Sequence, residues 1–274
     1  MPALFHDRQM DQLLQKFDRD RAAFKLIQED LEQFFRDSME TIAHRYWTSP
    51  KGPENPTPEQ LLAYYGKSDR YVYESTYTEG YTDHQRMLRL LQRLAKQQKK
   101  TPVLDFGGGG GGIALALART KIQTEYADVP GALTRFAGWR FFKHHLRVPI
   151  LDATRPLPES RYGMILAIDV LEHLSDLSAC VKKLHNGLKP GGSLVVTQCF
   201  SPGDPLHIPA WFKYNDLKLF NAFMKEHHFV YRGRIKSDLI SNSIYKVFRR
   251  PIVFRARLSR KMKSGGNLLL YAKE

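Results

Sequence analysis

Three aspartates and a run of glycines have the residue types and spacing to hold a nucleoside ligand. Asp105 lies two residues before six consecutive glycines at 107–112, and Asp128 and Asp152 end the next two predicted strands. A turn without side chains lets the backbone approach a ligand closely, and a carboxylate at a strand end can accept both hydroxyls of a ribose. Asp105 can contact a ligand ammonium, and Asp152 is placed to bind an adenine amino group. Three carboxylates around one turn favour a cationic ligand over a pyrophosphate.

The glycine pattern taken alone is less specific. Gly107, Gly109 and Gly112 also match G-x-G-x-x-G, a pattern of dinucleotide-dependent dehydrogenases. The carboxylate of Asp105 and the motifs that follow argue against an NAD-dependent oxidoreductase.

The segments around these residues alternate between short apolar runs and amphipathic stretches. Strands are predicted at about 102–106, 123–127, 148–151, 163–168 and 193–198, with helices at 112–119, 132–144 and 178–187. After a helix at 215–227, two further strands are predicted at 229–235 and 267–272. This rhythm indicates an α/β fold with a doubly wound, mainly parallel, seven-stranded sheet. Ligands of such sheets bind at the carboxyl ends of the strands, where the three aspartates lie.

Three segments resemble motifs of the class I S-adenosylmethionine-dependent methyltransferases. Residues 103–111 (VLDFGGGGG) resemble the D-x-G-x-G-x-G signature, and residues 188–194 (LKPGGSL) resemble the turn into strand five. Residues 167–174 (AIDVLEHL) resemble the strand-four motif of the ubiquinone/menaquinone-biosynthesis-like branch. One departure is that Gly108 and Gly110 fill positions that often carry larger residues, at a folding cost of roughly 0.5–1 kcal/mol per extra glycine.

The resemblance implies a Rossmann-like methyltransferase fold with S-adenosyl-L-methionine as cofactor. It assigns Asp105 to the methionine end of the cofactor, Asp128 to the ribose, and Asp152 with Ala153 to the adenine. The glycines that would approach the cofactor and the residues that would lie beside its sulfonium are Gly107, Gly109, Gly111, Ile168 and Asp169. The alternative for Asp152 is a turn carboxylate bonded to backbone, and the alternative for Glu172 is a carboxylate that stabilises a helix start.

Methyl transfer needs an acceptor held in line with the methyl group and a base where the acceptor keeps its proton. His207, in the loop after the fifth predicted strand, is the first candidate for this base, ahead of His173 and Tyr77. His173 has a structural role as its alternative. Tyr77 belongs to a tyrosine-rich stretch at 64–81, which we expect to form either a wall of the acceptor site or a packing surface. No metal site is predicted.

Two domains are predicted: an N-terminal helical region at 1–82 that covers the acceptor site, and the methyltransferase domain at 83–274. Apolar residues near a 3.5-residue spacing predict one or two helices within 7–47. A Pro-rich loop follows at 48–58, and a capping box at 57–60 with Pro58 begins a short helix. Another helix is predicted at 83–100.

Positive charge concentrates near the end of the chain. Lys and Arg number 42 against 28 Asp and Glu, a net charge of +14. Much of this excess lies at 230–263, with a basic insertion at 238–263 that can be drawn as two amphipathic helices. An anionic membrane surface is one interpretation of this segment, and a solvated surface is the other.

A cytoplasmic location is predicted, with peripheral membrane association as an alternative. The N-terminus is polar, no apolar run has the ~20 residues needed to span a bilayer, and Cys180 and Cys199 are expected to be reduced and buried.

The sequence therefore predicts an S-adenosylmethionine-dependent methyltransferase that acts on a small-molecule, glycan or lipid acceptor. Enzymes that methylate exocyclic base amines carry an Asn/Asp-Pro-Pro-Tyr/Phe sequence in strand four, and this chain does not. One alternative is a nucleic-acid methyltransferase that uses the basic C-terminal segment. The other is a non-catalytic protein that binds the cofactor. Methylation of oxygen, nitrogen or carbon stays open.

Overall fold

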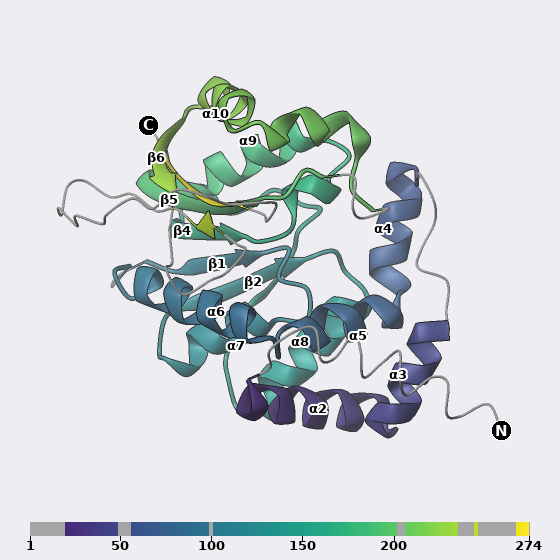
Figure 1. Cartoon of the computed structure of the whole chain (residues 1–274). Coiled ribbons are helices and arrows are strands. Elements are labelled where there is room, and N and C mark those ends of the chain that lie inside the picture. The colour runs from purple at the N-terminus through teal and green to yellow at the C-terminus, as the bar shows by residue number, and fades with distance from the viewer. Residues whose placement is uncertain are drawn as a thin grey trace.

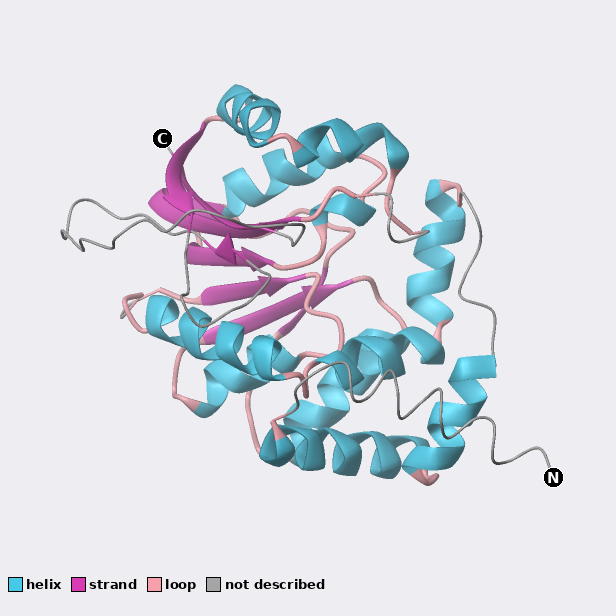
Figure 2. Ribbon diagram, viewed as in Figure 1, coloured by secondary structure: helices cyan, strands magenta, loops and turns pink. Residues whose placement is uncertain are grey.

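A computed structural model describes residues 20–48, 56–98, 101–201, 206–234, 244–245 and 267–273. A mixed β-sheet lies at the centre, with helices on both faces (Figures 1 and 2). Its strands are β1 (Val103–Phe106), β2 (Thr124–Asp128), β3 (Ile150–Asp152), β4 (Tyr162–Ala167), β5 (Leu188–Gln198), β6 (Phe229–Arg234), β7 (Ile244–Tyr245) and β8 (Asn267–Lys273). Their order is β3-β2-β1-β4-β5-β8-β6, and β7 pairs with β8 beside this path.

The strand directions confirm a doubly wound, mainly parallel sheet. Strands β3, β2, β1, β4 and β5 are parallel neighbours, and β8 runs antiparallel between β5 and β6. The two-residue strand β7 pairs with Asn267 and Leu268, beyond the part of β8 that β6 occupies. The prediction of an amphipathic helix is therefore wrong at Ile244–Tyr245, because the edge of β8 offers backbone partners there. The rest of the basic insertion lies outside the described residues.

The helices are α2 (Arg21–Phe35), α3 (Met39–Thr48), α4 (Pro58–Lys67), α5 (Asp69–Thr78), α6 (Thr82–Ala95), α7 (Gly112–Arg119), α8 (Ala132–Lys143), α9 (Leu177–Gly187) and α10 (Leu217–Glu226), with 3₁₀ turns η1 (Leu171–His173) and η2 (Pro209–Asn215). Helices α9 and α10 cover one face of the sheet, and α6, α7 and α8 cover the other (Figure 1). Alternate strand residues supply the two cores: Ile165 packs with Leu184 and Phe220, whereas Leu166 packs with Leu91 and Leu117.

The N-terminal region forms two helices before the Pro-rich loop, as one of the two alternatives predicted. They are separated at Arg36, which has a φ of +54° and ends α2. Helix α4 begins with the predicted capping box, in which the Thr57 hydroxyl accepts from Gln60 N–H and Pro58 takes the first helical position. Apolar residues of α2, α3 and α5 form one buried cluster with Phe136 of α8. The domain boundary at residue 82 stays a prediction.

Both cysteines are free, with Cys180 buried and Cys199 half-buried. Among the described helices, none combines the length and the apolar character that crossing a bilayer requires.

Candidate functional site

The glycine run forms the turn between β1 and α7, at the carboxyl ends of the parallel strands. Gly107, Gly109 and Gly111 have φ values of +69°, +54° and +79°, in the left-handed region that favours glycine. The Gly107 N–H donates to the Ala127 carbonyl at 2.7 Å, which fixes the turn against β2. The backbone is therefore held where the sequence predicts close approach to a ligand.

Gly108 and Gly110, the two departures from the motif, are explained by close neighbours. A Cβ at Gly108 would lie 2.6 Å from Asp105 Oδ2. A Cβ at Gly110 would collide with Thr76 Oγ1 and lie 3.2 Å from Glu79 Oε1. Thr76 belongs to α5 and Glu79 follows it directly. The N-terminal helices therefore leave no room for a larger residue at Gly110, and Asp105 leaves none at Gly108.

Asp105 lies beneath the turn with 1% of its surface exposed. Its Oδ2 accepts a hydrogen bond from the Ala114 N–H of α7 at 3.0 Å. Burial raises the pKa of Asp105 to about 7 against the lowering effect of this hydrogen bond, and repulsion from Asp128 and Glu79 adds to the rise. A cationic ligand group nearby would stabilise the ionised carboxylate.

Asp128 ends β2 on the other side of the turn. Its carboxylate accepts from Gly109 N–H at 2.7 Å and from Val129 N–H at 2.6 Å. Burial raises its pKa to about 6, although these hydrogen bonds favour the ionised form. The Tyr126 hydroxyl donates to the Gly109 carbonyl at 2.8 Å, which is a second hydrogen bond between β2 and the glycine turn. Asp128 therefore couples the position of the turn to the end of β2.

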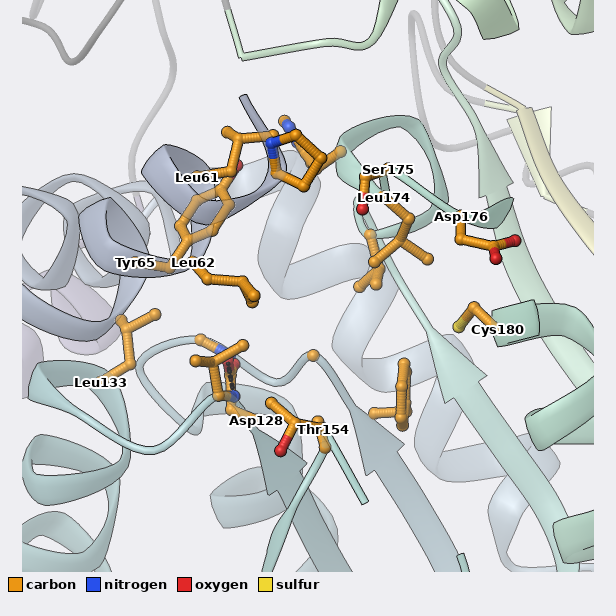
Figure 3. Close-up of a pocket in the computed structure, with 18 of the residues that line it drawn as sticks. Leu61, Leu62, Tyr65, Asp128, Leu133, Thr154, Leu174, Ser175, Asp176 and Cys180 are labelled. Atoms are coloured by element: carbon orange, nitrogen blue, oxygen red, sulfur yellow. Dashed lines mark hydrogen bonds between the residues drawn. The ribbon is translucent and has the colours of Figure 1, made fainter. Parts of the chain in front are cut away.

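Two adjoining cavities meet at this turn. The smaller, of about 290 Å³, is lined by Asp128, Ala153 and Thr154. Figure 3 shows apolar side chains of α4 on the opposite side of this cavity, and the segment 174–176 on a third side. The larger cavity, of about 550 Å³, is lined by Asp105 and by residues that follow β4 and β5. The residues that line both cavities are Tyr71, Gly107, Gly109, Asp169 and His173.

Most of the predicted cofactor residues line one of these cavities. Those on the smaller cavity are Gly107, Gly109, Asp128, Ala153 and Asp169, and those on the larger are Asp105, Gly107, Gly109, Ile168 and Asp169. The structure thus brings residues from the ends of β1, β2, β3 and β4 to one place.

Gly111 and Asp152 line neither cavity. Gly111 precedes α7, and a Cβ there would lie 3.0 Å from Ala137 and from Phe141 of α8, so its absent side chain permits helix packing. The Asp152 carboxylate accepts from the Thr154 backbone N–H at 2.8 Å and from its hydroxyl at 2.6 Å. The Thr154 hydroxyl is the main cause that lowers the pKa of Asp152. This is the alternative turn role, and contact with adenine stays a prediction.

Of the three candidate bases, the structure places the two histidines together. His173 and His207 both line the larger cavity, with ring centroids 4.7 Å apart. Tyr77 lines neither cavity, and its ring packs against Phe24, Tyr73 and Tyr81 in the N-terminal cluster. The packing alternative therefore describes Tyr77, and the structure does not bring it to the histidines.

Several lining residues were not singled out from the sequence. Tyr65 and Tyr71 line the smaller cavity and come from the tyrosine-rich stretch, which was the available signal. His84 lines the larger cavity from the first turn of α6. Burial lowers the pKa of His84 to about 4, so this ring is neutral at physiological pH. No local pattern marks His84 in the sequence.

A buried ion-pair network that the sequence also did not indicate holds the turn from outside. Arg140 of α8 donates to the Gly110 carbonyl at 2.7 Å. It pairs with Asp30 of α2 at 2.9 Å and with Glu79 at 3.0 Å, and all three side chains are buried. Opposite charges so placed keep the N-terminal helices, α8 and the glycine turn in fixed register.

Comparisons with known proteins agree with this geometry. The family model described as a methyltransferase domain matches residues 79–235. No curated protein sequence matches the chain.

Solved structures with a similar fold include YcgJ of Bacillus subtilis, with a TM-score of 0.47, 20% identity, and 56% of this chain and 71% of that chain covered. Phosphoethanolamine N-methyltransferase 2 of Haemonchus contortus, in complex with S-adenosyl-L-methionine, has a TM-score of 0.48 and 18% identity, with 60% and 42% covered. The DszA carbon methyltransferase has a TM-score of 0.50 and 15% identity, with 73% and 57% covered. This chain thus spans less than two thirds of the latter two. At such identities the likeness concerns the fold alone.

The family model covers more than half of the chain, including the glycine turn, Asp128 and both histidines. The chain therefore belongs to the methyltransferase domain family.

Proposed function

We propose that this enzyme methylates a small-molecule, glycan or lipid acceptor that binds between the two histidines and helix α4. One observation carries the proposal: the cavity beside Asp128 and the cavity beside His207 share the glycine turn and Asp169. A cofactor at the turn would therefore lie next to the space that the histidines border. In-line transfer requires this adjacency of donor and acceptor.

The residues at the turn fit S-adenosylmethionine, which supplies a methyl group on a positively charged sulfur. Asp128 would hold the ribose hydroxyls, and Asp105 would stand near the ammonium. Both carboxylates are buried with raised pKa values, so a cationic ligand would favour their ionised forms. The site therefore offers negative charge to such a ligand.

The side chains of α4 form an apolar wall of the smaller cavity, which adjoins the cavity that the two histidines border. Leu61, Leu62 and Tyr65 line the smaller cavity opposite Asp128 and Thr154 (Figure 3). Such a wall excludes water from a bound ligand. The Asp-Val-Leu-Glu-His-Leu segment at 169–174 supports placement in the ubiquinone/menaquinone-biosynthesis-like branch.

His207 has the geometry to accept a proton from the acceptor. Its Nδ1 lies 2.7 Å from the Ser201 carbonyl oxygen. A carbonyl can only accept, so Nδ1 carries the proton and Nε2 of the neutral ring keeps its lone pair. A histidine in this form can serve as a general base.

The test is single-turnover methylation with labelled cofactor, supplied in turn with small-metabolite, glycan, lipid and RNA fractions. We expect labelled product in one of the first three fractions. His207→Ala should slow the reaction by about 10²–10⁴-fold, whereas His227→Ala, a partner of Ser178 outside both cavities, should not. An unchanged rate with His207→Ala would refute the assignment of His207 as the base. Label found on RNA alone would refute the proposed acceptor class and favour a nucleic-acid methyltransferase.

Peripheral association with anionic membranes is proposed from the charge of segment 230–263, most of which lies outside the described residues. Co-sedimentation with anionic liposomes should be lost on charge reversal at Arg249, Arg250, Arg255 and Arg257. No sedimentation at low salt would refute the membrane proposal and leave methyl transfer untouched.

A further inference from the structure

Glu172, His173 and His207 come together at the carboxyl ends of two neighbouring parallel strands. Glu172 and His173 form the 3₁₀ turn η1 that follows β4, and His207 lies in the connection that follows β5. The Ile208 N–H donates to the Glu172 carbonyl at 2.9 Å and ties these two loops together. One carboxylate oxygen of Glu172 and one ring nitrogen of each histidine all lie within 4.8 Å of one another.

The hydrogen bonds of the two rings orient them as metal-binding histidines are oriented. Nδ1 of His207 lies 2.7 Å from the Ser201 carbonyl oxygen, and Nδ1 of His173 lies 3.2 Å from the Leu206 carbonyl oxygen. Histidines that bind a metal donate their other ring N–H to a carbonyl or a carboxylate, and this fixes the tautomer and the ring. Each ring is therefore set to present Nε2 as its ligand nitrogen.

We infer that Glu172, His173 and His207 bind a divalent first-row metal ion, for which Zn²⁺ is the best match. Two imidazoles and one carboxylate are a donor set that Zn²⁺ uses in catalytic sites, where a fourth position stays open. Glu172 is 1% exposed, and a buried carboxylate is stabilised by a cation beside it. Asp105 and Asp169 line the same cavity.

The cluster needs only a small contraction to bind such an ion. Ligand atoms around tetrahedral Zn²⁺, at ~2.0–2.1 Å from the metal, lie about 3.3–3.5 Å from one another. One ring nitrogen of each histidine and one carboxylate oxygen lie within 4.8 Å of one another, so atoms at that separation need movements of about 1 Å or less per residue. Rotations of three side chains on two short loops supply this without a shift of the sheet.

The ion deepens the proposed function, on which this step depends, by selecting a hydroxyl as the acceptor group. A hydroxyl bound to the open position has a lowered pKa, so its proton leaves to water at neutral pH. The acceptor oxygen forms a new bond to the methyl carbon, while the methyl–sulfur bond breaks and its electron pair stays on sulfur. In this scheme His207 acts as a ligand in place of a base, and the reaction is O-methylation.

Metal binding is tested on the full chain after removal of metals with a chelator. Calorimetry should show one Zn²⁺ per chain, and Co²⁺ should give the visible absorption bands of a tetrahedral site. Glu172→Gln and His207→Ala should each weaken Zn²⁺ binding at least tenfold. The matched control is His185→Gln, since His185 packs on Phe229 and lines neither cavity. It should bind as the wild type does.

The outcomes separate this inference from the proposed function. Zn²⁺ should raise the Tm of the wild type and not that of Glu172→Gln, which also shows whether the variant folds. The inference is overturned if the wild type does not bind one Zn²⁺ per chain. It is also overturned if Glu172→Gln and His207→Ala bind Zn²⁺ as tightly as the wild type does. If labelled methyl product forms at the full rate in excess chelator, the metal inference is overturned and the methyltransferase function still stands. Failure to bind S-adenosylmethionine with or without Zn²⁺ would count against the proposed function instead.

Discussion

Gly110→Ala tests whether helix α5 sets the composition of the glycine turn. The φ of Gly110 lies outside the left-handed region. In open space the substitution would therefore stabilise the protein by about 0.4–1 kcal/mol, because alanine restricts the unfolded chain. In this structure the new Cβ would collide with Thr76 Oγ1 and lie 3.2 Å from Glu79 Oε1. Thr76 is fully buried and Glu79 is held by Arg140, so neither can move freely.

We therefore expect Gly110→Ala to lower the free energy of unfolding by about 1–3 kcal/mol, the usual cost of overpacking. Thr76→Ala removes the colliding oxygen and leaves the Thr76 Cβ at 3.4 Å, an ordinary contact. In that background Gly110→Ala should cost less than ~1 kcal/mol, and the double-mutant cycle should show a coupling of about 1–2 kcal/mol. The loss of the buried Thr76 side chain itself cancels in the cycle.

Urea unfolding gives the free energies, and calorimetric titration gives the affinity for S-adenosylmethionine. The single variant should also bind the cofactor at least tenfold more weakly, since the displaced turn carries the Gly109 N–H that positions Asp128. The reasoning is refuted if Gly110→Ala is as stable as the wild type, or if it costs the same in both backgrounds.

Three further predictions follow from the buried charges. Arg140→Met leaves Asp30 and Glu79 buried without their partner and should lower the free energy of unfolding in urea by about 3–5 kcal/mol. The control Arg155→Met, at an exposed ion pair, should change it by less than ~0.5 kcal/mol. Equal changes in the two variants would contradict the role of the buried network. Because the folded-state pKa of Asp105 is raised to about 7, the cofactor-free protein should lose stability as pH rises from about 4 to about 7, by up to about 4 kcal/mol from this group. Asp105→Asn should flatten that slope, and an unchanged slope would show that other groups cause it. Asp128→Asn should weaken cofactor binding at least tenfold with unchanged folding by circular dichroism, and full affinity would exclude Asp128 from the ribose site.

Local patterns were sufficient for the order of strands and helices from residue 101 to residue 198. The apolar run of β4 marks a strand, because strand residues buried on both faces leave a near-continuous apolar signature. The capping box at Thr57 was equally visible, since its hydrogen bonds join residues three apart. The short strand β7 was missed, because its pairing depends on an edge supplied by β8, at the end of the chain.

The sequence by itself determined the glycine turn, the carboxylates beside it and hence the class of cofactor, because these features lie within single β–turn–α units. Only the tertiary structure decided why Gly108 and Gly110 are glycines, which tyrosines face the cavities, and that Glu172, His173 and His207 share one place. These depend on helices and loops that pack together from distant parts of the chain, as Arg140 does with Asp30 across 110 residues. Such packing is driven by burial over the whole fold, so no short stretch of residues records it.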